Sequence, residues 1–191
     1  AIIYSIWLYD HNYNTSLSNE IINKWTLFME NYGTDENTCL YKTEVLGTRK
    51  YSNHPRGCAM AYLLHYMGRF NPDLAKSKWI LYKKHMKKSL FGFTGFREYP
   101  ETYNGKWTPD SGPIIKGIGV AASGLAMNAS ATLDDRKTFE ELNYSISKFT
   151  NSFCFFEKFI RSNPLTKIGT DILATSIHLN AETKMQHKRA S

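Results

Sequence analysis

The amino-acid sequence predicts an all-α fold in which buried inner helices alternate with amphipathic outer helices. Apolar residues recur mostly at intervals of three and four positions, as on one face of a helix, and strand-like alternation is confined to 38–45. The segments beginning near 56, 112 and 170 are apolar or rich in small residues on all sides. Those beginning near 18, 72 and 133 carry charge along one face. A helix that is apolar all round is buried, so the first group is expected inside and the second outside.

The first expected helices have recognisable starts and stops. Residues 1–9 read as the last turns of an apolar helix whose start is missing, which suggests a fragment or a processed product. The next helix begins after capping residues at 16–18, has an acidic first turn and stops at Gly33. A further helix follows the segment NHPRG and ends near Phe70.

The later helices are expected from similar signals. Asn71 is the expected N-cap of a helix over 72–90, with Pro72 at the first helical position, where its missing N–H costs nothing. An inner helix is expected over 112–130, and an outer one over 132–149 with Thr132 as its cap. The last expected helix covers 169–184.

The spacing of three glycines predicts how these helices are organised. Gly57, Gly112 and Gly169 stand near the starts of the inner helices, 55 and 57 residues apart, which indicates a repeated two-helix unit. Six such hairpins in a closed ring would take about 340 residues. The chain is therefore expected to form about half of an (α/α)6 toroid as one domain over 1–183, followed by a basic tail at 184–191.

The composition limits the classes of function. The formal net charge is +7, and basic residues gather in 76–88 and in the tail. The segment 76–88 is best explained as an outer helix with a solvated lysine face, although a membrane-surface role also suits it; nucleic-acid binding is not expected. No run of 18 apolar residues is present, and the three cysteines lack metal-binding spacing, so neither a membrane span nor a metal or cofactor is expected.

Polar residues gather in front of the expected inner helix at 112. Asp110 and Ser111 stand at its N-terminus, where Asp110 is either a helix cap or an acid or base that projects into a pocket. Arg97 and Glu98 are either a pair that holds a polar substrate or a structural ion pair. If two carboxylates act on a glycosidic bond, Glu98 or Glu101 pairs with Asp110.

Other candidate binding residues stand at the same expected end of the inner helices. His54 and Arg56 flank a proline before the preceding inner helix. Tyr99, Tyr103 and Trp107 form either a stacking platform for a ligand or a lid over the core. Two further histidines, His65 and His178, lie in apolar helices and are expected to be satisfied core residues.

One motif is interpreted as a chance match. Residues 117–122 read Gly-x-Gly-x-x-Ala after an apolar run, as in a dinucleotide-binding fold. That fold requires a second strand after the following helix, whereas another helix is expected here. Close approach of neighbouring helices explains the small residues better.

Two segments carry a resemblance to a known family. Phe96-Arg97-Glu98-Tyr99-Pro100 and Asp110-Ser111-Gly112-Pro113, ahead of a small-residue helix, resemble the C-terminal half of linalool dehydratase/isomerase-like domains, toroids related in fold to six-hairpin glycosidases. The resemblance implies an isoprenoid or carbohydrate substrate and acid/base chemistry, as in a lyase, an isomerase or a glycosidase-like hydrolase. The family's catalytic residues lie partly in the other half, so none is transferred.

The sequence therefore yields two hypotheses. In the first, Asp110 and Glu98 are catalytic, and a further group of residues binds substrate: His54, Arg56, Arg97, Tyr99, Tyr103, Trp107 and Ser111. In the second, the chain is a non-catalytic helical module that docks onto the missing half of a toroid, onto a second copy or onto a membrane surface.

Overall fold

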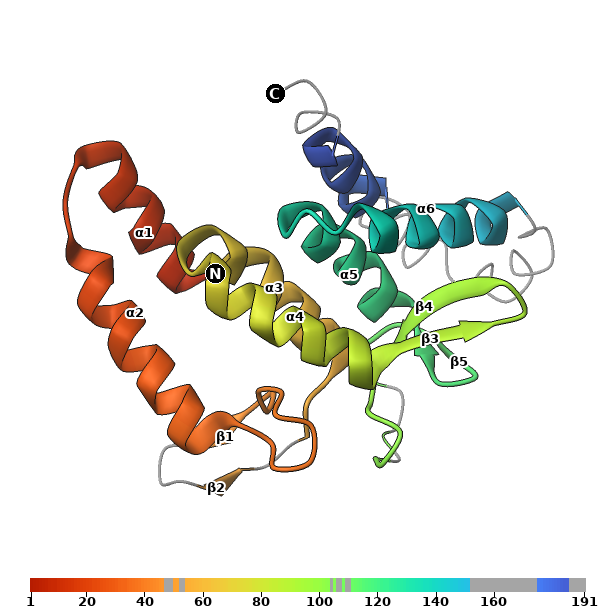
Figure 1. The fold of residues 1–191 in the computed structure, drawn as a ribbon, viewed down its shortest axis with the longest axis horizontal. Coiled ribbons are helices and arrows are strands. Elements are labelled where there is room, and N and C mark those ends of the chain that lie inside the picture. Colours follow the sequence, from red (N-terminus) through yellow and green to blue (C-terminus); the bar gives the residue numbers. More distant parts are fainter. Residues whose placement is uncertain are drawn as a thin grey trace.

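A computed structural model describes residues 1–46, 50–51, 54–103, 105, 108, 111–151 and 175–185. The chain opens with a hairpin of α1 (Ile2–Tyr13) and α2 (Leu17–Phe28), which the π-helical turn η1 (Met29–Gly33) continues. This hairpin lies at one end of the molecule (Figure 1). The Asp10 carboxylate fixes its bend, because it accepts the backbone N–H groups of Leu17 at 3.0 Å and Ser18 at 2.6 Å and so caps α2.

Helices α3 (Gly57–Phe70) and α4 (Pro72–Met86) form the second hairpin, after the short antiparallel pair β1 (Val45–Leu46) and β2 (Lys50–Tyr51). The Asn71 side chain accepts the Leu74 N–H at 3.4 Å, and Pro72 occupies the first turn of α4. The predicted cap and start of this helix are therefore confirmed.

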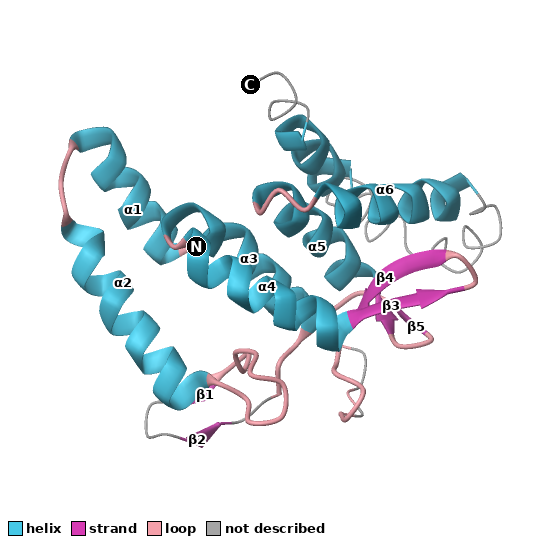
Figure 2. Ribbon diagram, viewed as in Figure 1, coloured by secondary structure: helices cyan, strands magenta, loops and turns pink. Residues whose placement is uncertain are grey.

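A four-stranded antiparallel sheet follows α4 (Figure 2). Its strands are β3 (Lys87–Leu90), β4 (Phe93–Arg97), β5 (Ile114–Ile115) and β6 (Ile118–Gly119), in the spatial order β3-β4-β6-β5. Two tight turns join its hairpins, Phe91–Gly92 with φ of 50° and 79°, and Lys116–Gly117 with φ of 52° and 85°. Two successive residues with positive φ make the type I′ turn that matches the twist of antiparallel strands.

The prediction of an all-α half toroid is wrong, because this sheet makes the fold mixed α/β. The segment 112–119, expected as the start of an inner helix, instead holds β5, β6 and their turn, and α5 begins only at Val120. The segment 87–90, expected as the end of a helix, is β3. In both places the glycine in a type I′ turn outweighs the helix-like spacing of apolar residues.

The last described helices are α5 (Val120–Thr132), α6 (Arg136–Asn151) and a helical stretch at 175–185. Thr132, the predicted cap of the helix after α5, is instead the last residue of α5. Asp135 takes the capping role, since its Oδ1 accepts the Thr138 N–H at 3.1 Å. The expected helical start at 169–174 and the tail residues 186–191 lie outside the described residues.

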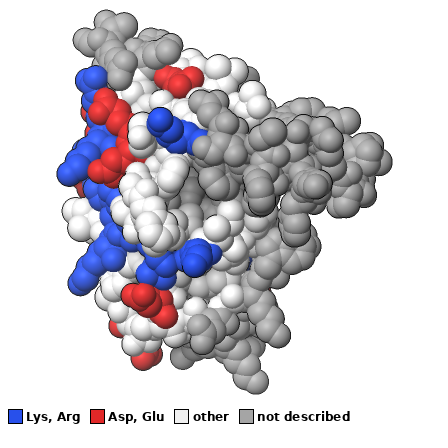
Figure 3. Space-filling view, turned by 90° about the vertical axis from the view of Figure 1, so that its right-hand side faces the viewer, with Lys and Arg blue, Asp and Glu red and all other residues white. Residues whose placement is uncertain are grey.

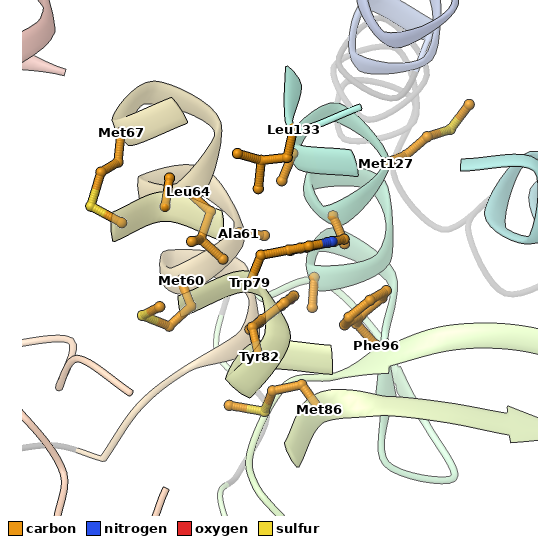
Figure 4. Close-up of a cluster of buried hydrophobic side chains, with 14 of the residues drawn as sticks. Met60, Ala61, Leu64, Met67, Trp79, Tyr82, Met86, Phe96, Met127 and Leu133 are labelled. Atoms are coloured by element: carbon orange, nitrogen blue, oxygen red, sulfur yellow. The ribbon is translucent and has the colours of Figure 1, made fainter. Parts of the chain in front are cut away.

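The core lies between α3, α4, α5 and β4 (Figure 4). Trp79, Tyr82 and Phe96 stack there, with the Tyr82 and Phe96 rings 4.8 Å apart and nearly parallel. Helix α5 packs closely on α3 because the residues that it buries include Ala122, Ala126 and Ala129. The interpretation of its small residues as a means of close helix approach agrees with this packing.

Half of the lysines in the basic segment 76–88 form ion pairs with acidic residues of the same protein. Three of its six lysines form ion pairs: Lys78 with Glu30, Lys83 with Asp135, and Lys87 with Glu141. In the view of Figure 3, basic and acidic side chains are interspersed along one side of the molecule. The segment is therefore no uninterrupted cationic surface of the kind that tracks a phosphate backbone.

Candidate functional site

The N-terminus of α3 meets the end of β4 at a buried carboxylate. Glu98 directly follows β4 and is fully buried, and its Oε1 lies 2.9 Å from Nε of Arg56, the residue before α3. The same oxygen accepts the Cys58 thiol at 3.0 Å, and Oε2 accepts the Cys58 N–H at 3.3 Å. Because no side chain of its own caps α3, Glu98 provides the acceptor from a distant strand.

Burial raises the pKa of Glu98, and the hydrogen bond from Cys58 and the charge of Arg56 oppose this rise only in part. Both carboxylate oxygens are already engaged by Arg56 and Cys58. Because the Glu98 side chain is fully buried, it joins β4 to α3 and does not lie at the surface. It fixes the junction from which the neighbouring loop extends.

Two glycines make this junction possible. A Cβ at Gly57 would lie 2.0 Å from the Arg97 carbonyl oxygen, and a Cβ at Gly119 would lie 3.1 Å from Cβ of Glu98. The Gly57 N–H also donates to the Glu98 carbonyl at 2.8 Å. Glycine therefore lets the backbone of α3 reach the end of β4.

Arg56 also contacts the loop that follows β4, through a second nitrogen of its guanidinium group. Its Nη2 donates to Thr108 Oγ1 at 2.8 Å. The buried Ser111 hydroxyl donates to the Thr108 carbonyl at 2.8 Å, and Thr108 N–H donates back to Ser111 Oγ at 3.1 Å. Of the predicted site residues, Trp107 and Asp110 lie outside the described residues.

His54 and Tyr103, which are far apart in the sequence, stack with ring centroids 3.6 Å apart. The Tyr103 hydroxyl donates to Asp35 Oδ1 at 2.8 Å. Burial alone would raise the pKa of Asp35, but hydrogen bonds from Thr38 and Tyr103 outweigh it and lower that pKa. Sequence reasoning missed Asp35, because nothing in its local pattern points to a tyrosine 68 residues away.

A surface hollow of about 280 Å³ opens beside this junction. We call it the rim hollow. It is lined by Arg97, Tyr99, Pro100, Glu101, Tyr103, Gly105, Ile114 and Gly117. Arg97 Nη2 donates to Glu101 Oε1 at 2.9 Å, with the Glu101 side chain 81% exposed. Three of the predicted binding residues, Arg97, Tyr99 and Tyr103, thus come together here, whereas Arg56 and Glu98 do not line the hollow.

A second hollow of about 280 Å³ lies at the bend between α1 and α2. Burial would raise the pKa of Asp10 in its wall, but hydrogen bonds from Ser18, Thr15 and Leu17 outweigh burial and lower that pKa to about 2. Both oxygens of this carboxylate accept hydrogen bonds at the start of α2, so Asp10 is less available to a ligand than the exposed Glu101 of the rim hollow.

The two histidines interpreted as core residues have partners. His65 Nδ1 lies 2.9 Å from Thr132 Oγ1, and its Nε2 lies 3.3 Å from Lys184 Nζ. Because an ammonium only donates, Nε2 is the acceptor and Nδ1 carries the proton. Burial and the charge of Lys184 lower the pKa of His65 to about 4. His178 Nε2 lies 2.9 Å from Asn143 Oδ1.

No protein-family model, curated protein or solved structure matches this chain. Within the described ranges, no group of three or more His, Cys, Asp or Glu side chains is placed to hold a metal ion. In that same part of the chain, every helix falls short of the length or the apolar character that crossing a bilayer requires.

Proposed function

We propose that the protein binds a small polar ligand in the rim hollow. The observation that carries this proposal is the convergence there of Arg97, Tyr99 and Tyr103 with the exposed carboxylate of Glu101. Aromatic rings provide stacking faces, and charged groups fix the orientation of a polar molecule. At about 280 Å³ the hollow is at the small end of ligand sites, whose volumes usually begin at about 300 Å³. It therefore suits a ligand of roughly the size of a monosaccharide or a short terpenoid alcohol.

The resemblance of 96–100 and 110–113 to linalool dehydratase/isomerase-like domains supports a carbohydrate or isoprenoid ligand and acid/base chemistry. In this proposal Glu101 in the wall of the hollow is the carboxylate that meets the ligand, and Asp110, which lies outside the described residues, stays the second carboxylate that the sequence predicts. Glu98 positions the loop through Arg56.

Filling the hollow tests the proposal. We expect monosaccharides or linalool to shift the backbone amide signals of Gly105 and Gly117 in NMR spectra of the wild-type protein. Ile114 lines the hollow on an edge strand, so Ile114→Trp should block the space and reduce these shifts by at least about tenfold.

The matched control is Ile80→Trp, at a position that is 64% exposed on α4. It should bind like the wild type. Shifts that persist unchanged in Ile114→Trp, or that fail to occur in the wild type with any of these ligands, would refute the binding of neutral sugars and linalool at the rim hollow.

A second candidate function, pairing with another copy of the chain, rests on the outer surface of α1 and α2. The α1–α2 hairpin exposes eight large apolar side chains: Ile2, Leu8, Tyr9, Tyr13, Leu17, Ile21, Leu27 and Phe28. The segment 2–28 contains one lysine and no arginine, whereas the whole chain carries a net charge of +7. Two copies of a basic protein repel least where basic residues are few, so we propose that the surface of this hairpin pairs with itself.

Light scattering over a range of concentrations tests this pairing. We expect the molar mass to rise toward that of a dimer, and Tyr9→Lys to raise the dissociation constant by about tenfold or more, because it places two lysines in the paired face. Tyr144→Lys, at a similarly exposed position on α6, is the control and should leave dimerisation unchanged. A wild-type protein that stays monomeric throughout would refute the pairing.

A further inference from the structure

Two cationic side chains project from one face of the sheet beside the rim hollow. Lys88 on β3 pairs with Gly95 on β4, and directly opposed residues in antiparallel strands point to the same face. Arg97 lies two residues beyond Gly95 and therefore points to that face as well. Gly95 itself has no side chain, and the Ile118 side chain of β6 packs over it, since a Cβ at Gly95 would lie 2.5 Å from Ile118 Cγ2.

The turn between β5 and β6 brings both cations to one point. A Cβ built on Gly117 would lie 3.6 Å from Nη1 of Arg97 and 3.8 Å from Nζ of Lys88, with no other atom within 4 Å outside its own neighbours in the chain. Gly117 is glycine with φ of 85°, and it lines the rim hollow. The structure thus leaves an open position that two positively charged nitrogens flank.

Positive charges outnumber negative ones among the described side chains around Gly117. Lys88 Nζ donates to the Lys116 carbonyl at 2.7 Å, and among the described residues no carboxylate forms an ion pair with it. Lys116 itself is exposed and adds a third positive charge. Among the residues that the structure describes, the acidic side chain paired with this group is that of Glu101, which is 81% exposed, and such solvated pairs are weak.

We propose that this position binds the anionic group of the ligand, a carboxylate or a phosphate. The inference rests on the proposed binding function of the rim hollow and specifies the class of molecule as an acid, such as a sugar acid or a sugar phosphate. Arg97 provides a planar pair of donors that matches two oxyanion oxygens, and Lys88 adds a point charge. When the anion binds, Arg97 releases Glu101, whose carboxylate is then free to meet the uncharged part of the ligand.

The experiment is an NMR titration with inorganic phosphate and, separately, with acetate at constant ionic strength. Saturable shifts at the Gly117 amide are expected for at least one of the two anions, and the stronger response distinguishes a phosphate from a carboxylate site. Lys88→Gln retains a donor for the Lys116 carbonyl and removes the charge, so it should weaken this binding by about fivefold to tenfold. Lys137→Gln, at an exposed position on α6, should bind as the wild type does.

Non-saturating shifts at Gly117, or equal binding by Lys88→Gln and Lys137→Gln, would overturn the anion site. The two proposals fail separately. If neutral sugars or linalool bind to the wild type and Ile114→Trp blocks them, while both anions fail to bind, ligand binding in the rim hollow is supported and the anion site is refuted. If the neutral ligands and the anions all fail, both proposals fall.

Discussion

Replacement of Glu98 by alanine is expected to lower the free energy of unfolding by about 3–5 kcal/mol, the usual cost of removing one partner of a buried ion pair. The Arg56 side chain is only 13% exposed and would lose its carboxylate. The Cys58 N–H, at the start of α3, would lose the acceptor that Glu98 provides. The largest stability effect at the candidate site therefore belongs to a residue that does not line the hollow.

Urea denaturation of three proteins measures this effect. Glu98→Gln keeps an acceptor for the Cys58 N–H and should cost less than Glu98→Ala. Glu101→Ala removes the exposed partner of Arg97 and should cost no more than about 1 kcal/mol. If Glu98→Ala costs as little as Glu101→Ala, the buried junction does not hold α3 against β4.

The pH dependence of Glu98 has a definite sign. Its pKa in the folded protein is raised above 4.5 by burial, which Cys58 and Arg56 oppose only in part. The folded state therefore binds more protons than the unfolded state as the pH rises from 4.5, and the contribution of Glu98 to stability falls over that range. Glu98→Gln does not titrate, so its stability relative to the wild type should improve from pH 4.5 upward.

The sequence predicts several helix boundaries because their causes are local. Asn71 and Pro72 start α4 through contacts within a single turn. Gly33 ends the helical run that begins with α2, as expected. Such signals depend on a few adjacent residues and are visible in one sequence.

Strands β3, β5 and β6 were not predicted, because the spacing of their apolar residues and the residues of their turns indicate different structures. The segments SLFGFT and PIIKGIGV contain apolar residues at spacings that also suit a helix. The turn pairs Phe91–Gly92 and Lys116–Gly117 decide in favour of hairpins, since both residues of each pair have positive φ. A residue followed by glycine between short apolar runs is the signal that would have found them.

The candidate site was predicted in part. Arg97 ends β4, and Tyr99 and Tyr103 follow it in the next loop, so their sequence proximity brings them to the same hollow. The contribution of Lys88 depends on the register of β3 against β4, and that of Asp35 on a contact with Tyr103. Neither can be read from spacing, because both arise only when distant segments pack.

Replacement of Asp135 by alanine is expected to lower the free energy of unfolding by about 2–4 kcal/mol, combining a lost helix cap with an unpaired buried donor. Asp135 accepts the Thr138 N–H at 3.1 Å at the start of α6 and the Trp79 indole N–H at 2.8 Å. Lys83 Nζ lies 2.6 Å from the same carboxylate. Asp73→Ala, in the exposed first turn of α4, is the control and should cost less than about 1 kcal/mol.

The effect of Asp135 should disappear in acid. Burial alone would raise its pKa, but hydrogen bonds from Lys83, Trp79 and Thr138 outweigh burial and lower the pKa from 3.8 to about 2. Between these values the unfolded state binds more protons, so the stability that the charged group contributes is complete above 3.8 and is lost as the pH falls to about 2. The stability difference between the wild type and Asp135→Asn should therefore shrink over that interval. A difference that stays constant would show that the cap acts through hydrogen bonds alone, without its charge.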